Sequence, residues 1–121
     1  MKYILIIVIS VLLNASAQLL LKKGMMSYSD ITFSLNDINF WLPSLLKNYF
    51  LYIGFLCYGV SILIWMYILS RVEVSFAYPF LSIGYIITAI FGHLVFNEQL
   101  SFTRISGILI ICLGVILISK S

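Results

Sequence analysis

Charged side chains are scarce in this chain, which has seven Lys and Arg and four Asp and Glu among 121 residues, 9% of the total. In soluble globular domains, about a quarter of the residues are charged. Hydrophobic residues make up 63% of the sequence, and the mean hydropathy is +1.15. This balance excludes an ordinary soluble domain and favours a chain that lies in lipid.

The few carboxylates also avoid the long apolar stretches, because they stand at Asp30, Asp37, Glu73 and Glu98. A proton-coupled transporter of this size would need a titratable group inside the membrane. Asn14 stands near the middle of the first apolar stretch, where that group would be expected. Its amide can bind a polar group but cannot exchange a proton for one. We therefore expect no stoichiometric proton exchange at this position.

Patterns typical of catalysis are missing as well. The sequence has no nucleophile–base pair, no His/Cys cluster at metal-ligand spacing and no phosphate-binding loop. Nothing therefore predicts an enzyme, a cofactor, a metal site or a nucleic-acid partner. Cys57 and Cys112 both fall inside apolar stretches and are most simply small apolar fillers.

Four apolar stretches of membrane length dominate the sequence, at about residues 3–21, 49–69, 74–96 and 103–119. Each is close to the roughly 20 residues that cross a bilayer as a helix. Four strands could not close into a barrel. The predicted fold class is thus an all-α membrane protein with four transmembrane helices, forming a single domain over residues 1–121.

The start of the chain imitates a secretory signal, because Lys2, an apolar stretch and the Ala15-Ser16-Ala17 triplet resemble a cleavage site. The apolar stretch continues through three leucines after Gln18. We therefore expect a retained helix, ended by the basic pair and glycine of residues 22–24.

Residues 25–48 form the only substantial loop, and its second half has a helical pattern. Apolar residues recur at helical spacing, at Ile38, Trp41, Leu42, Leu45, Leu46 and Tyr49. The pattern predicts a short amphipathic helix in the headgroup layer, with Pro43 near its start and Trp41 as an anchor. The alternative is a simple extension of the second membrane helix.

A polar stripe runs along the first helix. Ser10, Asn14, Gln18 and Lys22 recur every four residues, so they share a helical face that drifts slowly around the axis. Hydrocarbon offers these groups no hydrogen-bond partner. We expect the stripe to face another helix or a wet cavity; Asn14 and Gln18 either bind a ligand or hold helices together.

The third stretch carries a small and hydroxylated face. Pro79 predicts a kink about one turn inside the membrane. The face is typical of a cavity lining or of close packing, and its members are Ser75, Tyr78, Ser82, Tyr85, Ala89 and Gly92. The four-residue turn at 71–74 makes the second and third helices antiparallel neighbours.

In the fourth stretch, Gly107 and Gly114 lie seven residues apart and so on one face. Such glycines let two backbones approach closely, which predicts a dimer interface, with packing inside one chain as the alternative. Ser101 is the expected N-cap of this helix. We interpret Glu98 as a solvated turn residue or a partner of Arg104, and His93 as the site of an interfacial hydrogen bond.

Basic residues give little orientation bias. Lys2, Arg71 and Lys120 fall on one side of the predicted bundle, and Lys22, Lys23, Lys47 and Arg104 on the other. Such a chain inserts in both orientations or depends on a partner subunit.

Four segments together resemble the small four-helix branch of the drug/metabolite transporter superfamily. They are residues 14–22 (NASAQLLLK), 74–82 (VSFAYPFLS), 96–101 (FNEQLS) and 107–118 (GILIICLGVILI). Small multidrug-resistance exporters of this branch carry a glutamate in the first helix, and alignment on Lys22 puts Asn14 at that position. The resemblance is closer to flippase subunits for undecaprenyl-phosphate aminoarabinose, through the Ala-Gln of the first helix and the Ala77-Tyr78-Pro79 segment.

The resemblance implies a small multidrug-resistance-like bundle that moves a polyprenyl-phosphate-linked sugar across the bacterial inner membrane. It also implies a homodimer, or a heterodimer with a second small four-helix subunit. A phosphate would need basic residues at the interface, and a sugar would need amides and hydroxyls inside. The expected substrate-binding residues are Asn14, Gln18, Lys22, Tyr78, Ser82, Tyr85, Arg71 and Arg104. The alternatives are an exporter without the helix 1 glutamate and a non-transporting accessory subunit.

Overall fold

The computed structural model describes residues 2–29 and 31–121, and these residues form helices and connecting turns. Four segments are long and apolar enough to cross a membrane: Ile4–Tyr28, Tyr49–Leu69, Val74–Phe96 and Phe102–Ser119. The predicted fold class, an all-α bundle with four membrane-length helices, is confirmed. The α-helices are α1 (Ile4–Met25), α2 (Ile38–Leu46), α3 (Tyr49–Leu69), α4 (Val74–Ala77), α5 (Ser82–Phe96) and α6 (Phe102–Ser119).

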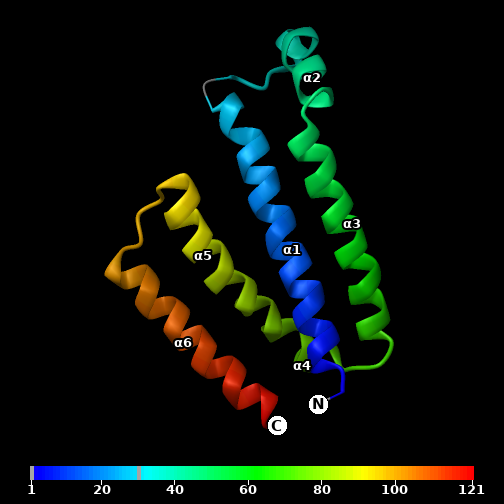
Figure 1. Ribbon diagram of the computed structural model, residues 1–121, viewed down its shortest axis with the longest axis vertical. Coiled ribbons are helices and arrows are strands. Elements are labelled where there is room, and N and C mark those ends of the chain that lie inside the picture. The colour runs from blue at the N-terminus through cyan, green and yellow to red at the C-terminus, as the bar shows by residue number, and fades with distance from the viewer. Residues whose placement is uncertain (1, 30) are drawn as a thin grey trace.

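Helices α1 and α3 form a long antiparallel pair (Figure 1). Small residues set their close approach: a Cβ on Gly54 would lie 2.9 Å from the Leu21 side chain and 3.3 Å from the Ala17 carbonyl oxygen. The Ser10 hydroxyl donates to the Ser61 carbonyl oxygen at 3.0 Å, across the same contact. This part of the predicted polar stripe therefore joins two helices.

Gly24 does not end the first helix, contrary to the sequence prediction. The helix runs to Met25, and Gly24 is buried within it. A Cβ at Gly24 would lie 2.9 Å from Leu51 and 3.2 Å from Phe50, so the glycine makes room for the start of α3. Packing against a neighbouring helix, rather than chain termination, explains the residue.

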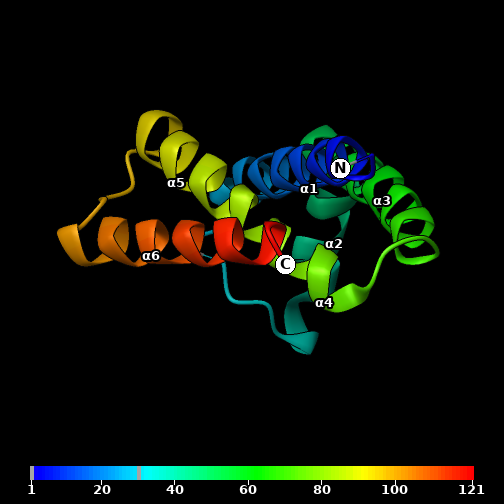
Figure 2. The ribbon, with the colours of Figure 1, turned by 90° about the horizontal axis from the view of Figure 1, so that it is seen from below.

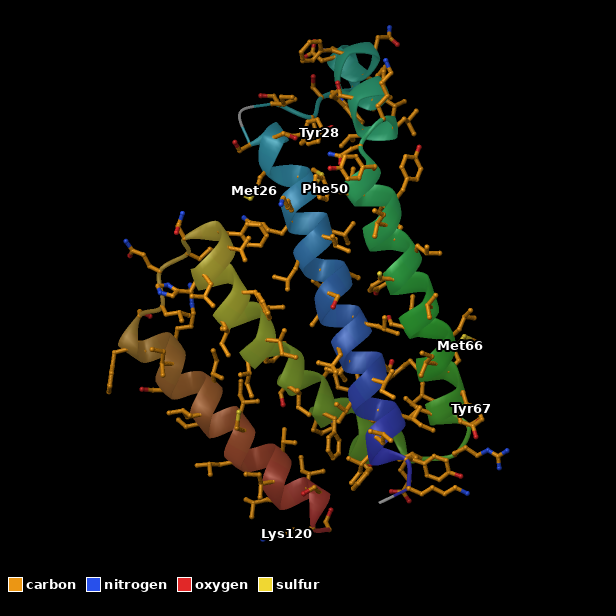
Figure 3. The ribbon with its side chains drawn as sticks, in the orientation of Figure 1. Met26, Tyr28, Phe50, Met66, Tyr67 and Lys120 are labelled. Carbon is orange, nitrogen blue, oxygen red and sulfur yellow. The ribbon has the colours of Figure 1, made fainter. Side chains whose placement is uncertain are left out.

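The predicted short helix in the loop is present as α2, and it is separate from α3. The break occurs at Asn48, whose Oδ1 accepts from the Phe50 amide at 3.1 Å and whose Nδ2 donates to the Gly24 carbonyl oxygen at 2.8 Å. The Tyr28 hydroxyl donates to the Ser44 carbonyl oxygen at 2.9 Å. Figure 3 shows Tyr28 and Phe50 at the end of the bundle where α2 lies. Because α2 begins at Ile38, Pro43 stands past its middle rather than near its start.

The segment over residues 74–96 is broken around its proline, as predicted. The chain passes from α4 through a 3₁₀ turn at Tyr78–Leu81 into α5. Phe80 and Ala77 are buried here against Ile7, Val11 and Ile68, which form the apolar core of the bundle. The break thus lies where α1, α3 and the third segment meet.

Helix α5 departs from this meeting point alongside α1, and α6 lies outside α5, away from α3 (Figures 1 and 2). Both chain ends and the α3–α4 turn lie at one end of the bundle, and Lys120 is there too (Figure 3). None of the 18 residues of α6, all of which the structure describes, is buried. Of the four spans, α6 is therefore the one least buried by the rest of the chain.

Candidate substrate cleft

Asn14 and Gln18 face a cleft of about 480 Å³ between α1, α3 and α5. Gly84 of α5 lies over Val11 and Ala15 of α1, so the two helices run close together at this level. The lining mixes amide, phenol and aliphatic groups, from Val11, Asn14, Ala15, Gln18, Tyr58, Leu81, Gly84, Tyr85 and Thr88. The cleft therefore offers a few hydrogen-bonding groups within a mainly apolar lining, as ligand pockets commonly do.

A second cavity of about 220 Å³ adjoins the first, because Asn14, Tyr58 and Leu81 line both. It extends along α3 past Ser61 to Trp65, and Tyr78 lies on its other side. The rings of Trp65 and Tyr78 meet edge to face with centroids 6.5 Å apart. Asn14 and Tyr58 are thus the polar residues that border both cavities.

A third cavity, of about 320 Å³, lies between the proline turn and α6. Tyr78, Ser82 and Tyr85 line it from one side, with Gly114 on the other. Tyr85 also lines the main cleft, so the predicted α5 face is shared between two cavities.

Several hydroxyl groups near these cavities are already engaged. Ser82 donates to the Pro79 carbonyl oxygen at 2.7 Å, and Thr88 donates to the Gly84 carbonyl oxygen at 2.9 Å. Ser82 is also buried. Because each hydroxyl has one proton, these groups can only accept further hydrogen bonds. Ser82 is thus the weakest of the predicted sugar-binding residues.

The amides of Asn14 and Gln18 differ from these hydroxyls. Within residues 2–29 and 31–121, neither amide, nor the phenol of Tyr58, Tyr78 or Tyr85, forms a hydrogen bond to another protein group. A primary amide has two donors and an acceptor oxygen that need partners at membrane depth. A polar ligand, water or a second subunit must supply those partners.

The structure separates the predicted basic residues. Lys22 lies one helical turn beyond Gln18 on the same face of α1 but does not line the cleft, and its Nζ is 3.8 Å from Glu98 Oε1. Arg104 donates from Nη1 to the Gln99 carbonyl oxygen at 2.8 Å, so the predicted alternative of a Glu98–Arg104 pair is wrong. Arg71 belongs to the α3–α4 turn at the opposite end, with its guanidinium 5.8 Å from the Tyr67 ring centre.

The turn between α5 and α6 has a defined geometry. Asn97 ends α5 in the left-handed conformation, with φ of 56°, and the Glu98 amide donates to the Gly92 carbonyl oxygen at 3.0 Å. His93 Nδ1 lies 2.9 Å from the Glu98 carbonyl oxygen, the kind of hydrogen bond predicted for His93. Ser101 accepts from the Arg104 amide at 3.1 Å, which confirms it as the N-cap of α6.

Gly107 and Gly114 meet nothing within the chain. A Cβ built on either glycine has no heavy atom within 4 Å among the described residues. The predicted alternative, close packing of these glycines inside one chain, therefore does not occur. Gly107 is exposed, whereas Gly114 is half-buried and lines the third cavity, opposite Tyr78 and Tyr85.

Sequence reasoning missed Tyr58 and Trp65, although both line the cavities beside Asn14. They lie seven residues apart on one face of α3, with Ser61 between them. Helix α3 is apolar and aromatic all round, so periodicity could not mark this face. The only sequence signal for this face was that Ser10 and Ser61 stand at similar depths in their predicted membrane spans.

The structure thus combines four membrane-length helices with a cleft whose amides and phenols have no hydrogen-bond partner among the described residues. Residues 1–120 match the EamA-like transporter family, and the chain belongs to this family. The predicted resemblance to the drug/metabolite transporter superfamily is confirmed.

Curated relatives indicate which kind of transporter the chain is similar to. The chain is 35% identical over 118 residues to the "Probable 4-amino-4-deoxy-L-arabinose-phosphoundecaprenol flippase subunit ArnF" of Serratia proteamaculans, covering 92% of this chain and 87% of the relative. It is 30% identical over 115 residues to the corresponding subunit ArnE of Aeromonas hydrophila, covering 95% of each chain. No solved structure matches. These relatives are flippase subunits, and the predicted function as a membrane flippase subunit is supported.

Proposed function

We propose that this protein is a subunit of a flippase that moves a polyprenyl-phosphate-linked sugar across the bacterial inner membrane. The observation that carries the proposal is the cleft, in which the unpaired amides of Asn14 and Gln18 lie one to two turns below the ammonium group of Lys22. Two groups of similar relatives, ArnF and ArnE, are named as subunits of such flippases.

The cleft suits the chemistry of a lipid-linked sugar. Such a lipid has an anionic phosphate, a polar sugar and a long apolar tail, and only the first two must leave water or the headgroup layer. Lys22 can bind the phosphate, since a charge-assisted hydrogen bond is stronger than a neutral one. With a rise of about 1.5 Å per residue, Asn14 lies about 12 Å deeper, within reach of the sugar as it crosses.

The tail does not need to enter the bundle. The surfaces of α1, α3, α5 and α6 carry exposed large apolar side chains, including Leu12, Leu56, Leu94 and Leu113. A chain of isoprene units can remain among the lipid tails beside these surfaces. Only the headgroup then crosses through the cleft, which matches the cleft's limited volume of about 480 Å³.

The functional unit in this proposal is a dimer. Relatives of two kinds, ArnE and ArnF, point to a pair of small subunits, either two copies of this chain or this chain with a second four-helix subunit. Helix α6 offers the interface, because its glycines are open and none of its residues is buried within the chain. A second subunit docked there would cover the third cavity, which lies between the proline turn and α6.

The test measures binding of polyprenyl phosphate and of a glycosylated polyprenyl phosphate to purified protein by native mass spectrometry. Lys22→Gln should weaken binding of both lipids about tenfold, at the low end for a charge-assisted contact because the Lys22 side chain is 52% exposed. Asn14→Leu should spare the phosphate lipid but abolish discrimination between sugar headgroups. Lys120→Gln, a basic residue at the opposite end of the bundle, is the matched control and should change neither affinity.

The same titrations can contradict the proposal. Equal and weak binding of both lipids by the wild-type protein, together with tight binding of a lipophilic cation, would assign the cleft to an exporter of the multidrug type.

A further inference from the structure

Three cavities of the bundle meet around one apolar side chain. Leu81 lines the cleft of about 480 Å³, the second cavity of about 220 Å³ and the third cavity of about 320 Å³. Among the described residues that line these cavities, Leu81 is the one that all three share. A leucine therefore stands at the junction between spaces that are otherwise lined in part by amides and phenols.

The cleft and the third cavity occupy different depths of the bundle. The cleft extends along α1 to Gln18 and along α5 to Thr88, toward the end where α2 lies. The third cavity extends along α6 to Ile118, close to the end of the bundle where both chain ends lie (Figure 1). Joined past Leu81, the two cavities would extend through most of the depth of the bundle.

The structure fixes the chain on both sides of Leu81 and leaves its side chain room to turn. Phe80 is buried in the apolar core, and the buried Ser82 donates to the Pro79 carbonyl oxygen at 2.7 Å. Leu81, between them, is only half-buried. It ends the 3₁₀ turn Tyr78–Leu81, and such a turn inside a longer helical segment often marks a functional hinge. Because a leucine side chain can change between staggered rotamers, its rotation can open the junction without a movement of whole helices.

We propose that Leu81 is the gate of the transport path and that its size limits which headgroups pass from the cleft into the third cavity. The inference rests on the proposed function and adds the third cavity to the same path. A headgroup held at Asn14 meets an apolar side chain at the junction. Beyond it, the phenols of Tyr78 and Tyr85 line the third cavity and have no hydrogen-bond partner among the described residues, so they can bind a polar group that has passed. Leu81 thus affects the rate of passage, whereas Lys22 and Asn14 affect binding.

The expected effect follows from the size of the side chain. Leu81→Ala removes most of it and should accelerate headgroup exchange in proteoliposomes about two- to tenfold, the factor that corresponds to the cost of displacing a side chain from its rotamer. The gain should be greater for a polyprenyl phosphate that carries a disaccharide than for one that carries a monosaccharide. Leu81→Phe should slow exchange of both lipids. Neither variant should change the affinity for these lipids, because Lys22, Asn14 and Gln18 are intact.

The test measures exchange of these two lipids by the full-length protein, alone or with a related small subunit, and measures their affinities by native mass spectrometry. Leu81→Val removes less of the side chain and should accelerate exchange less, which keeps the test available if Leu81→Ala does not fold. Leu94→Ala and Leu94→Phe are the matched controls, because Leu94 of α5 is 68% exposed and lines none of the three cavities. Both controls should leave the exchange rates unchanged.

A purely structural role for Leu81 predicts a different result, in which Leu81→Ala lowers thermal stability and does not accelerate exchange of either lipid. That result, or equal exchange rates in the Ala, Val and Phe variants, overturns the assignment of Leu81 while the proposed function stands on the exchange by the wild-type protein. If the folded wild-type protein exchanges neither lipid in either assembly, the proposed function fails, and the assignment of Leu81 fails with it.

Discussion

At the scale of single residues, the polar groups of the spans fall into two classes. Several serine and threonine hydroxyls donate to backbone carbonyl oxygens, as Ser10 does to Ser61 and Ser82 to Pro79. The amides of Asn14 and Gln18 face the cleft instead. The side chains that hold helices together are therefore different from those that remain available to a ligand.

The two glycines Gly54 and Gly59 of α3 differ in the same respect, because one packs against a neighbouring helix and the other has no neighbour. Gly54→Ala should destabilise the protein by about 1–3 kcal/mol, because the new methyl group would overlap Leu21 and crowd the Ala17 carbonyl oxygen where α1 and α3 touch. Gly59→Ala, on the same helix with nothing within 4 Å, should be neutral or stabilising by up to about 1 kcal/mol. Unfolding of the purified variants in detergent, followed by circular dichroism, measures both. Equal stability of the two variants would mean that the α1–α3 contact is looser than described.

At the scale of elements, α6 stands apart from the other spans. It packs on α5 and on the Tyr78–Leu81 turn, and its outer face carries Leu109, Leu113 and Leu117 well exposed. In a membrane, apolar exposure costs nothing by itself, so helix association depends on close packing. The open glycines of α6 provide a surface for that packing.

Replacing Gly107 and Gly114 together by Leu should therefore dissociate a dimer without preventing membrane insertion, because the larger side chains hold the two backbones apart. Cross-linking yield in native membranes measures the effect. Gly59→Leu adds the same bulk at another glycine with no neighbour and should leave the yield unchanged. A yield unaffected by the double substitution would mean that this face of α6 meets lipid.

The elements also show what the sequence could and could not predict. The four spans, the break at Pro79 and the cap at Ser101 follow from local chemistry, namely hydrophobic length, a missing amide proton and a hydroxyl before a helix. Gly24 was misread as a helix end, because whether a glycine terminates or packs depends on a helix that begins some twenty-five residues later. The Lys22–Glu98 pair was missed for the same reason. The angle between α5 and α1 cannot be predicted from the sequence or from its periodicity.

At the scale of the whole molecule, the proposed transport path involves two subunits. Among the described residues, amide and phenol groups line the cleft together with apolar side chains, no carboxylate lines it, and Lys22 lies one helical turn beyond Gln18. In the proposed function, a lipid headgroup moves through the cleft with the help of a second subunit and without proton exchange at Asn14.

The most direct measurement of this account is headgroup movement in proteoliposomes that contain the protein alone or together with a related small subunit. A glycosylated polyprenyl phosphate is placed in both leaflets, and a membrane-impermeant reagent that modifies the sugar reports how fast the inner pool becomes accessible. The account predicts that the wild-type protein, in one of these two assemblies, accelerates this exchange and that Asn14→Leu and Lys22→Gln each slow it. It also predicts no proton leak that depends on Asn14 when a pH gradient is imposed. Full exchange rates in both variants, or proton flux abolished by Asn14→Ala, would contradict it.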